Sequence, residues 1–195
     1  MLEPDVSRET RERWEAYAAL LRKWTKRINL ISPATVGELE IRHIADSAQL
    51  LPLIGSEGRL CDLGSGGGLP IVVLACAQPD REMVAIESDI RKATFLRTCA
   101  RELAINLKVE AKRIEQVEPA KAHVLTARAL SPLSKLLDQV QRHLVEGGVA
   151  VLPKGQHADR EIEEAREHWS FRLEKTKSIT SENATILTIK DITRV

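Results

Sequence analysis

The stretch that decides the fold reads Leu60-Cys-Asp-Leu-Gly-Ser-Gly-Gly-Gly-Leu-Pro70. Four of its residues are glycines that fall within five positions, namely Gly64, Gly66, Gly67 and Gly68. Because glycine loses much backbone entropy in any ordered element, so many glycines in one place require a reason. The sequence predicts a tight turn between a strand and a helix, where a ligand meets the free N–H groups of the helix. A flexible glycine turn without a ligand is the alternative.

The spacing of the glycines indicates which ligand is expected. A dinucleotide-binding turn needs G-x-G-x-x-G, but Leu69 or Ile71 stands where its third glycine would have to be. The pattern that fits is G-x-G-x-G on Gly64, Gly66 and Gly68, directly behind the acidic residue Asp62. A second acid, Glu87, ends the next apolar run and can accept hydrogen bonds from both hydroxyls of a ribose. The pattern favours S-adenosylmethionine and disfavours a nicotinamide dehydrogenase.

Length and composition indicate one globular domain. A chain of 195 residues with 43% hydrophobic and 29% charged residues can bury a substantial core. Only 3% of the residues are aromatic, so base stacking cannot be the main means of holding nucleic acid. The net charge of +1 means that a polyanionic partner must meet a local basic face.

The cysteines and the N-terminal residues bear on localisation. Cys61, Cys76 and Cys99 are widely spaced in apolar surroundings, which predicts buried, reduced thiols. The charged first ten residues lack the apolar segment of a signal peptide, and no apolar run reaches membrane-spanning length. We therefore expect a cytoplasmic protein.

The order of the apolar runs predicts an α/β domain over residues 1–195, in which a helical cap (1–57) precedes a Rossmann-like core (58–195). In the cap we expect a helix over 7–27, a loop at Pro33 and Gly37, and short helices within 38–53. In the core we expect parallel strands at 59–63, 83–87, 107–112, 122–126 and 149–152. The expected core helices are 69–76, 90–103, 132–144 and 159–169. Residues 171–179 and 185–192 are predicted to close a seven-stranded sheet as an antiparallel hairpin.

Several short motifs then occur in a specific order from Trp24 to Gly155. They are Asn29-Leu30, His43-Ile-Ala-Asp46-Ser47, the glycine stretch, Glu87-Ser-Asp-Ile-Arg91-Lys92, Phe95-Leu96, Arg113-Ile114-Glu115, Thr126-Ala-Arg128-Ala-Leu130 and Leu152-Pro-Lys154-Gly155. In this order the sequence resembles the bacterial 16S ribosomal RNA guanine-N7 methyltransferases, also known as the glucose-inhibited division protein B family. One departure is Ile71, where the family usually has glycine. No glycine of the turn is lost, so we expect cofactor binding to be preserved.

The resemblance implies a class I methyltransferase fold, S-adenosylmethionine as cofactor, and 16S rRNA or the small ribosomal subunit as partner. It assigns cofactor contacts to Gly64, Gly66, Gly68 and Leu69, with Glu87 on the ribose and Ile114 and Glu115 flanking the adenine. Arg128 would bind the cofactor carboxylate or an RNA phosphate. The residues expected to contact RNA are Arg91, Lys92, Arg113 and Lys154.

The expected chemistry needs few catalytic groups. Guanine N7 carries a lone pair and no proton, so its attack on a sulfonium methyl group needs alignment and no general base. We therefore expect no catalytic residue, and no metal, because His43 and Asp46 lack further ligands and instead orient the cap. We expect a monomer. The competing hypotheses are a methyltransferase for another RNA or a small molecule, and a non-catalytic RNA-binding assembly factor.

Overall fold

The computed structural model describes residues 6–195, so residues 1–5 of the expected cap lie outside the described part. Its centre is one seven-stranded sheet in the order β3-β2-β1-β4-β5-β7-β6. The strands are β1 (Leu60–Leu63), β2 (Met83–Ile86), β3 (Leu107–Glu110), β4 (Ala122–Ala127), β5 (Leu144–Lys154), β6 (Trp169–Lys177) and β7 (Thr185–Arg194). The first five strands are parallel, and the last two are antiparallel to their neighbours. The predicted mostly parallel sheet with a closing hairpin is confirmed.

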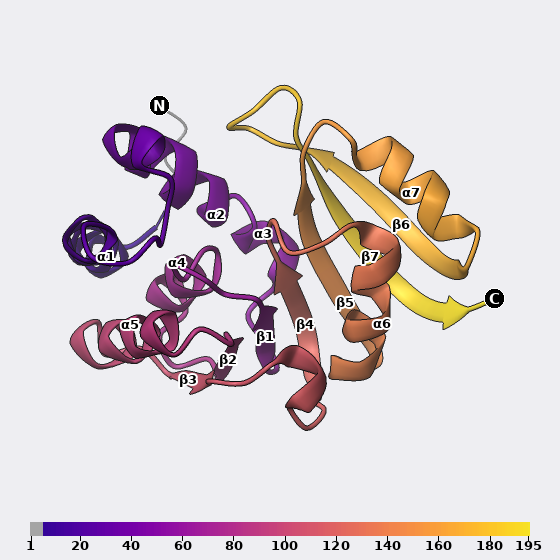
Figure 1. Ribbon diagram of the computed structural model, residues 1–195, viewed down its shortest axis with the longest axis horizontal. Helices are drawn as coiled ribbons and strands as arrows, with labels where there is room; N and C mark the ends of the chain where they lie inside the picture. The colour runs from indigo at the N-terminus through magenta and orange to yellow at the C-terminus, as the bar shows by residue number, and fades with distance from the viewer. Residues whose placement is uncertain (1–5) are drawn as a thin grey trace.

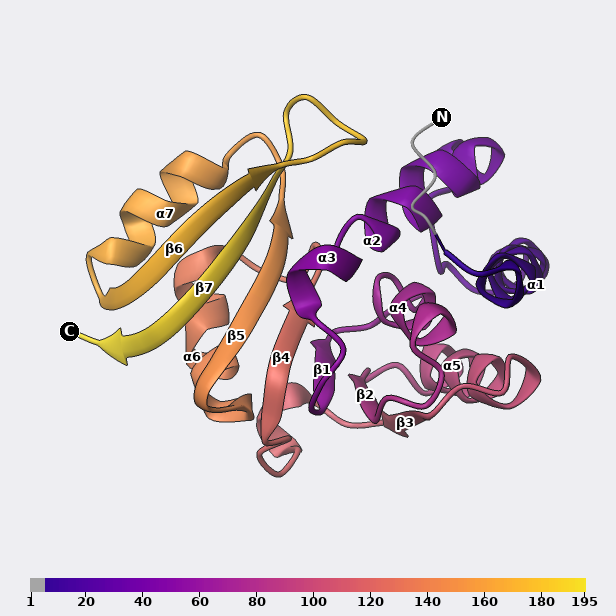
Figure 2. The ribbon, with the colours of Figure 1, turned by 180° about the vertical axis from the view of Figure 1, so that it is seen from behind.

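Helices cover both faces of this sheet (Figures 1 and 2). The α-helices are α1 (Arg8–Thr25), α2 (Asp46–Ala48), α3 (Leu51–Ile54), α4 (Ile71–Ala77), α5 (Ile90–Glu102), α6 (Leu133–His143) and α7 (Ala158–Arg166). The tighter or wider turns are η1 (Pro33–Glu38), η2 (Glu40–Ala45) and η3 (Ile114–Gln116). α1, α4 and α5 pack together on one face, whereas α6 and α7 pack together on the other.

Alternating strand residues divide the core into two clusters. Leu60 and Met83 contribute to the cluster shared with α1, α4 and α5, while Cys61, Leu63 and Val84 face the cluster shared with α6 and α7. This is the period-two pattern of a sheet that is buried on both faces. Cys61, Cys76 and Cys99 are all buried and free, as expected.

Helix α1 joins the N-terminal cap to the core. Ser7 caps it by accepting a hydrogen bond from the Thr10 N–H at 3.2 Å, within one residue of the predicted start. The buried Trp14 indole then donates to the carbonyl oxygen of Val73 in α4 at 3.0 Å. The cap is therefore packed directly on the first helix of the core.

The second half of the cap differs from the prediction. The expected loop at Pro33 and Gly37 is the 3₁₀-helix η1, because Pro33 at its first turn fixes a helical φ angle. The following segment, Glu40–Ala45, forms a π-helix, a wider turn for which the sequence pattern gives no signal. Short α-helical turns follow, as expected.

Strand β5 begins earlier than predicted. Residues 145–148 bulge out between two pairings with β4, Leu144 with Ala122 and Val149 with Val124. Gly147 lies in this bulge with a φ of +74°. In the sequence, the pair Gly147-Gly148 is typical of a turn before a strand, which is why the strand was predicted to begin at residue 149. Within residues 6–195, no helix combines the length and the apolar character needed to cross a membrane.

Candidate functional site

The glycine turn connects the carboxyl end of β1 to α4, as the sequence predicts. β1 lies between β2 and β4 in the sheet, and the connections from β1 and β4 run to helices on opposite faces. Such a switch point leaves a crevice at the carboxyl ends of the strands, where α/β proteins bind their ligands.

Each glycine of the turn has a different reason to lack a side chain. Gly64, Gly66 and Gly68 have φ angles of +65°, +52° and +86°. A Cβ atom on Gly68 would lie 2.6 Å from a methyl group of Val72, and one on Gly67 would lie 3.0 Å from the carbonyl oxygen of Leu30. At Gly66 the nearest atom would be a backbone oxygen 3.8 Å away. Gly66 therefore leaves open space where a ligand can approach the main chain, while its neighbours pack against protein.

Asp62 lies in β1 directly below this turn and is 1% exposed. Its Oδ1 accepts a hydrogen bond from the Thr126 hydroxyl at 2.6 Å, but Oδ2 has no partner among the described residues. Burial raises the pKa of Asp62 to about 7, the Thr126 hydrogen bond lowers it, and the nearby Glu87 charge adds to the rise. A buried carboxylate with one unused oxygen fits a cationic ligand group, which would stabilise its charge.

Glu87 follows β2 and is 8% exposed. One of its oxygens accepts from the Gly66 N–H and the other from the Asp89 N–H, both at 2.8 Å. These bonds hold the carboxylate beside the open side of the turn. Each oxygen keeps lone pairs that a ribose hydroxyl can use.

The other residues assigned to the cofactor lie around the same crevice edge. Leu69 is 5% exposed at the end of the turn, and Ile71 is fully buried at the start of α4, so the departure from the family pattern fills core space. Ile114 lies after β3 in η3 and packs partly against the α6 and α7 cluster. Glu115 is exposed in the same short helix.

Arg128 connects the crevice to the cap. It follows β4, and its guanidinium lies 3.3 Å from a carboxylate oxygen of Asp46 and 3.5 Å from Nδ1 of His43. Burial and the Arg128 charge lower the pKa of His43, so this imidazole is neutral at pH 7. The other Asp46 oxygen accepts from Gln49 at 2.8 Å and from the Thr180 hydroxyl at 2.7 Å. This cluster fastens the cap, β4 and the β6–β7 connection together.

The four residues expected to contact RNA differ in their surroundings. Arg91 is exposed and pairs at 3.3 Å with Asp89, the residue that caps α5, so it already has one internal partner. Lys92 lies next to it, and Arg113 is exposed before η3. Lys154 is mostly buried at the end of β5, where its ammonium pairs with Glu161 at 2.7 Å.

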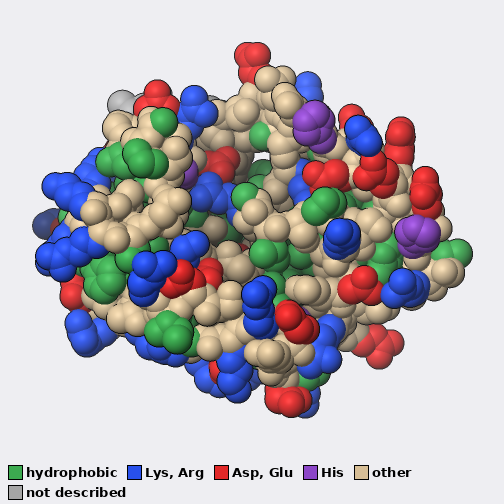
Figure 3. Space-filling model, in the orientation of Figure 1, with side chains coloured by type: hydrophobic (Ala, Val, Ile, Leu, Met, Phe, Trp, Pro, Cys, Tyr) green, Lys and Arg blue, Asp and Glu red, His purple; other side chains and the backbone are tan. Residues whose placement is uncertain are grey.

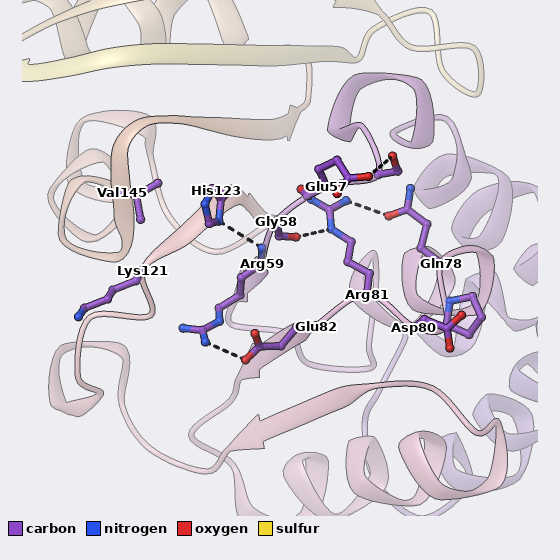
Figure 4. A pocket seen from close by; sticks show the side chains of 12 residues that line it. Glu57, Gly58, Arg59, Gln78, Asp80, Arg81, Glu82, Lys121, His123 and Val145 are labelled. Carbon is purple, nitrogen blue, oxygen red and sulfur yellow. Dashed lines mark hydrogen bonds and ion pairs between the residues drawn. The ribbon is translucent and has the colours of Figure 1, made fainter.

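A cavity of about 940 Å³ lies at the opposite edge of the sheet, at the amino ends of β1, β2 and β4 (Figure 4). Its two arginines are paired within the protein. Arg59 pairs with Glu82 at 2.9 Å, and Arg81 donates to the carbonyl oxygens of Gly55, Glu57 and Gly58. This guanidinium thereby satisfies the backbone after α3, so the network holds the connection into β1 and lies away from the glycine turn.

Several residues of the site could not be found from the sequence. Tyr17 in α1 is fully buried, and its hydroxyl donates to the Gly67 carbonyl oxygen at 2.6 Å. The Gln49 amide and the Thr180 hydroxyl both donate to Asp46, although Gln49 and Thr180 are 131 positions apart along the chain. Helical periodicity explains Tyr17 as a core residue, and only the tertiary structure reveals that it contacts the turn. Within residues 6–195 no cluster of His, Cys, Asp or Glu could hold a metal ion.

Comparisons with known proteins agree with this architecture. The family model described as GidB, rRNA small subunit methyltransferase G, matches residues 10–189. A "Ribosomal RNA small subunit methyltransferase G" of Ruegeria sp. (strain TM1040) is 42% identical over 100% of this chain and 97% of its own length. The protein of the same name from Granulibacter bethesdensis is 49% identical over 97% of this chain and 89% of its own length.

Among solved structures, a SAM-dependent methyltransferase from Aquifex aeolicus superposes with a TM-score of 0.62. The match covers 88% of this chain and 97% of that one at 12% identity, so it supports the Rossmann-like methyltransferase fold alone. The family model and the relatives span nearly the whole chain, including the glycine turn, both of its acids and Arg128. From this agreement it follows that the chain belongs to the GidB family, the rRNA small subunit methyltransferases G.

Proposed function

We propose that this protein transfers a methyl group from S-adenosylmethionine to N7 of a guanine in 16S rRNA. The observation that carries the proposal is the glycine turn, which is open at Gly66 and flanked by the carboxylates of Asp62 and Glu87. Membership of a family described as rRNA small subunit methyltransferases G supports ribosomal RNA as the substrate. The choice of guanine N7 rests on the motif resemblance and on the chemistry of the site.

The residues around the turn fit this cofactor. The unused oxygen of Asp62 and the backbone from Gly64 to Gly68 would hold the methionine end, and Glu87 would accept the ribose hydroxyls. As the resemblance implies, Leu69 would line the methionine and adenosine side together with the glycines, and Ile114 and Glu115 would flank the adenine. Arg128 can bind the cofactor carboxylate or an RNA phosphate, since its guanidinium is anchored by Asp46 and retains further donors.

The bound cofactor would supply an electrophilic methyl group on a sulfonium. The protein then has to hold the purine so that N7, the methyl carbon and the sulfur are in line, because N7 has no proton to remove. No side chain acts as a base in this mechanism. The residues that line the crevice would supply this orientation.

A basic surface supports binding of the RNA backbone. In Figure 3, Lys and Arg side chains gather on the side of the molecule that carries α1 and α5, whereas acidic side chains gather near α7. The last turn of α1 contributes Arg22 and Lys23, and the start of α5 contributes Arg91 and Lys92. Such a local face can bind phosphates although the net charge is only +1. Arg113 would extend these contacts toward the crevice, and Lys154 would contact the RNA at the crevice itself.

The test is transfer of a labelled methyl group from S-adenosylmethionine to small ribosomal subunits and to naked 16S rRNA that lack the modification. We expect one guanosine to become labelled, and chemical cleavage at 7-methylguanosine should map it. Labelling of transfer RNA or metabolites alone would favour another methyltransferase activity. Absence of cofactor binding in calorimetry would favour a non-catalytic assembly factor.

A further inference from the structure

A second cavity, of about 480 Å³, opens beside the glycine turn at the carboxyl ends of β4 and β5. Six of its lining residues matter here: Arg128, Leu130, Pro132, Pro153, Lys154 and Glu161. Leu130 joins the cavity to the turn, since its side chain lies 2.6 Å from the position that a Cβ atom on Gly64 would take. A flat group in this cavity would therefore have one edge near the turn.

The polar groups of the cavity form an incomplete hydrogen-bond set. The Lys154 ammonium donates to the Ser131 carbonyl oxygen at 2.9 Å and to Oε2 of Glu161 at 2.7 Å, which leaves one of its three N–H groups unused. Oε2 of Glu161 also accepts from the Leu133 N–H at 2.8 Å. Within residues 6–195, Oε1 of Glu161 accepts no hydrogen bond. Two lining side chains thus keep one donor and one acceptor that form no hydrogen bond with the described residues.

We propose that this cavity binds the target guanine by its Watson–Crick edge, with Lys154 donating to O6 and Oε1 of Glu161 accepting from N1–H. This inference rests on the proposed function and adds the residues that select the base. Leu130, Pro132 and Pro153 provide apolar surface for the faces of the ring. Enzymes that modify a base take it out of the stack and hold it in this way.

The order of the two polar groups favours guanine over adenine. In the proposed arrangement, position 6 of the purine, which adjoins N7, faces Lys154, and position 1 faces Oε1 of Glu161. Guanine places an acceptor and then a donor there. Adenine places a donor and then an acceptor, so both contacts would be repulsive.

The variant Glu161→Gln tests the acceptor with little change of shape. Its amide oxygen can keep the bonds to Leu133 and Lys154, while its NH₂ group replaces Oε1 and would face the N1–H donor. We expect kcat/KM for unmodified small subunits to fall roughly 10- to 100-fold, the loss typical of a specific base contact, with unchanged affinity for S-adenosylmethionine. The matched control is Glu164→Gln, on the same helix, where Glu164 forms an exposed pair with Arg160. It should leave both quantities unchanged.

A second measurement uses the unaltered protein, so it does not depend on the folding of a variant. Small subunits are reconstituted with inosine or 2,6-diaminopurine at the target position. Inosine keeps O6 and N1–H and should be methylated within a few-fold of guanosine, whereas diaminopurine keeps N7 but reverses both contacts and should react poorly.

Equal transfer to guanosine and diaminopurine, or an unchanged kcat/KM in Glu161→Gln, would overturn the assignment of this cavity while leaving the proposed function standing. No transfer from the unaltered protein to guanosine-containing subunits would overturn both.

Discussion

Gly66 is the residue of the turn whose replacement should affect ligand binding most directly. A carboxylate at this position would enter the open space and would lie beside Glu87, which accepts from the Gly66 N–H. We expect Gly66→Asp to abolish binding of S-adenosylmethionine, measured by isothermal calorimetry.

The chain offers a matched control for this variant. Gly147 also has a positive φ angle, of +74°, and no atom lies within 4 Å of the position of its missing Cβ. It belongs to the bulge at the start of β5, at the opposite edge of the sheet. Gly147→Asp should carry a similar backbone strain and bind the cofactor normally. If both variants lose binding, the loss comes from strain and gives no evidence for a ligand at Gly66.

Asp62 should make cofactor affinity depend on pH. Its pKa is about 7 without a ligand because the side chain is buried, and the facing charges are Glu87, which raises this pKa, and Arg128, which lowers it. A cationic ligand binds the ionised form better, so affinity should rise as the pH increases from about 6 to about 8 and then level off. Below the pKa, binding should lose up to about tenfold per pH unit and release a proton.

Calorimetry in two buffers of different ionisation enthalpy would count that proton. Asp62→Asn should bind the cofactor more weakly at the upper end of this range and show little pH dependence across it. A variant that keeps the full pH dependence would show that another group titrates.

For single residues, the sequence predicted where a residue lies in the fold better than it predicted which side chains that residue contacts. The turn glycines, Asp62 and Glu87 meet at one strand end because parallel strands bring their carboxyl ends to a common edge. For Lys154 and Arg91 the pattern gave only a charge after a strand or at a helix start. Their partners Glu161 and Asp89 depend on side-chain packing, which no spacing rule contains.

Among the elements, α1 should influence the cofactor turn through one hydrogen bond. The Tyr17 hydroxyl donates to the Gly67 carbonyl oxygen, and burial keeps the pKa of Tyr17 well above its usual value, so the hydroxyl remains a donor. In Tyr17→Phe the carbonyl oxygen loses its partner. We expect a loss of about 1–3 kcal/mol in the free energy of unfolding and a several-fold higher KM for the cofactor, with kcat changed less.

Trp14→Phe provides the comparison for this variant. Trp14 is on the same helix and also donates to a backbone carbonyl, but its acceptor is Val73 in α4 and not a residue of the turn. It should lower stability without raising the KM for the cofactor. A parallel rise of KM in both variants would mean that α1 acts only through general stability.

The elements also show where prediction from sequence fails. Strands and long helices were found within a few residues because their apolar periodicity is strong, as in α5 and β2. The prediction fails at Pro33–Glu38 and at the start of β5. Pro and Gly residues occur in turns, but they also occur in short 3₁₀-helices and in β-bulges, so the sequence does not distinguish these structures. The π-helix Glu40–Ala45 buries Ile44 in the core, and no spacing of apolar residues predicts its wider turn.

For the molecule as a whole, the uneven distribution of charge should govern RNA binding. Replacing Arg91 and Lys92 together by Gln should weaken binding to small subunits and lower the slope of log K against log salt by about 1.5–2 units, if each side chain meets one phosphate. Cofactor affinity should not change. The measurement is filter binding over a range of salt concentrations.

The control for this double variant is Arg172→Gln with Lys190→Gln. These two residues face each other on β6 and β7, are exposed, and lie at the edge of the sheet away from α5. Their loss removes the same charge from the other side of the molecule. An equal effect of the two double variants would show that net charge, and not a basic face, determines binding.

The position of β7 between β5 and β6 has a consequence for biosynthesis. A nascent chain delivers β6 before β7, so β6 has to wait without a partner in the sheet while the apolar edge of β5 stays uncovered. Open strand edges invite pairing with other chains. Ribosomes that stall or terminate shortly before Thr185 would therefore release polypeptides prone to aggregate, even though the entire cofactor crevice has already been translated.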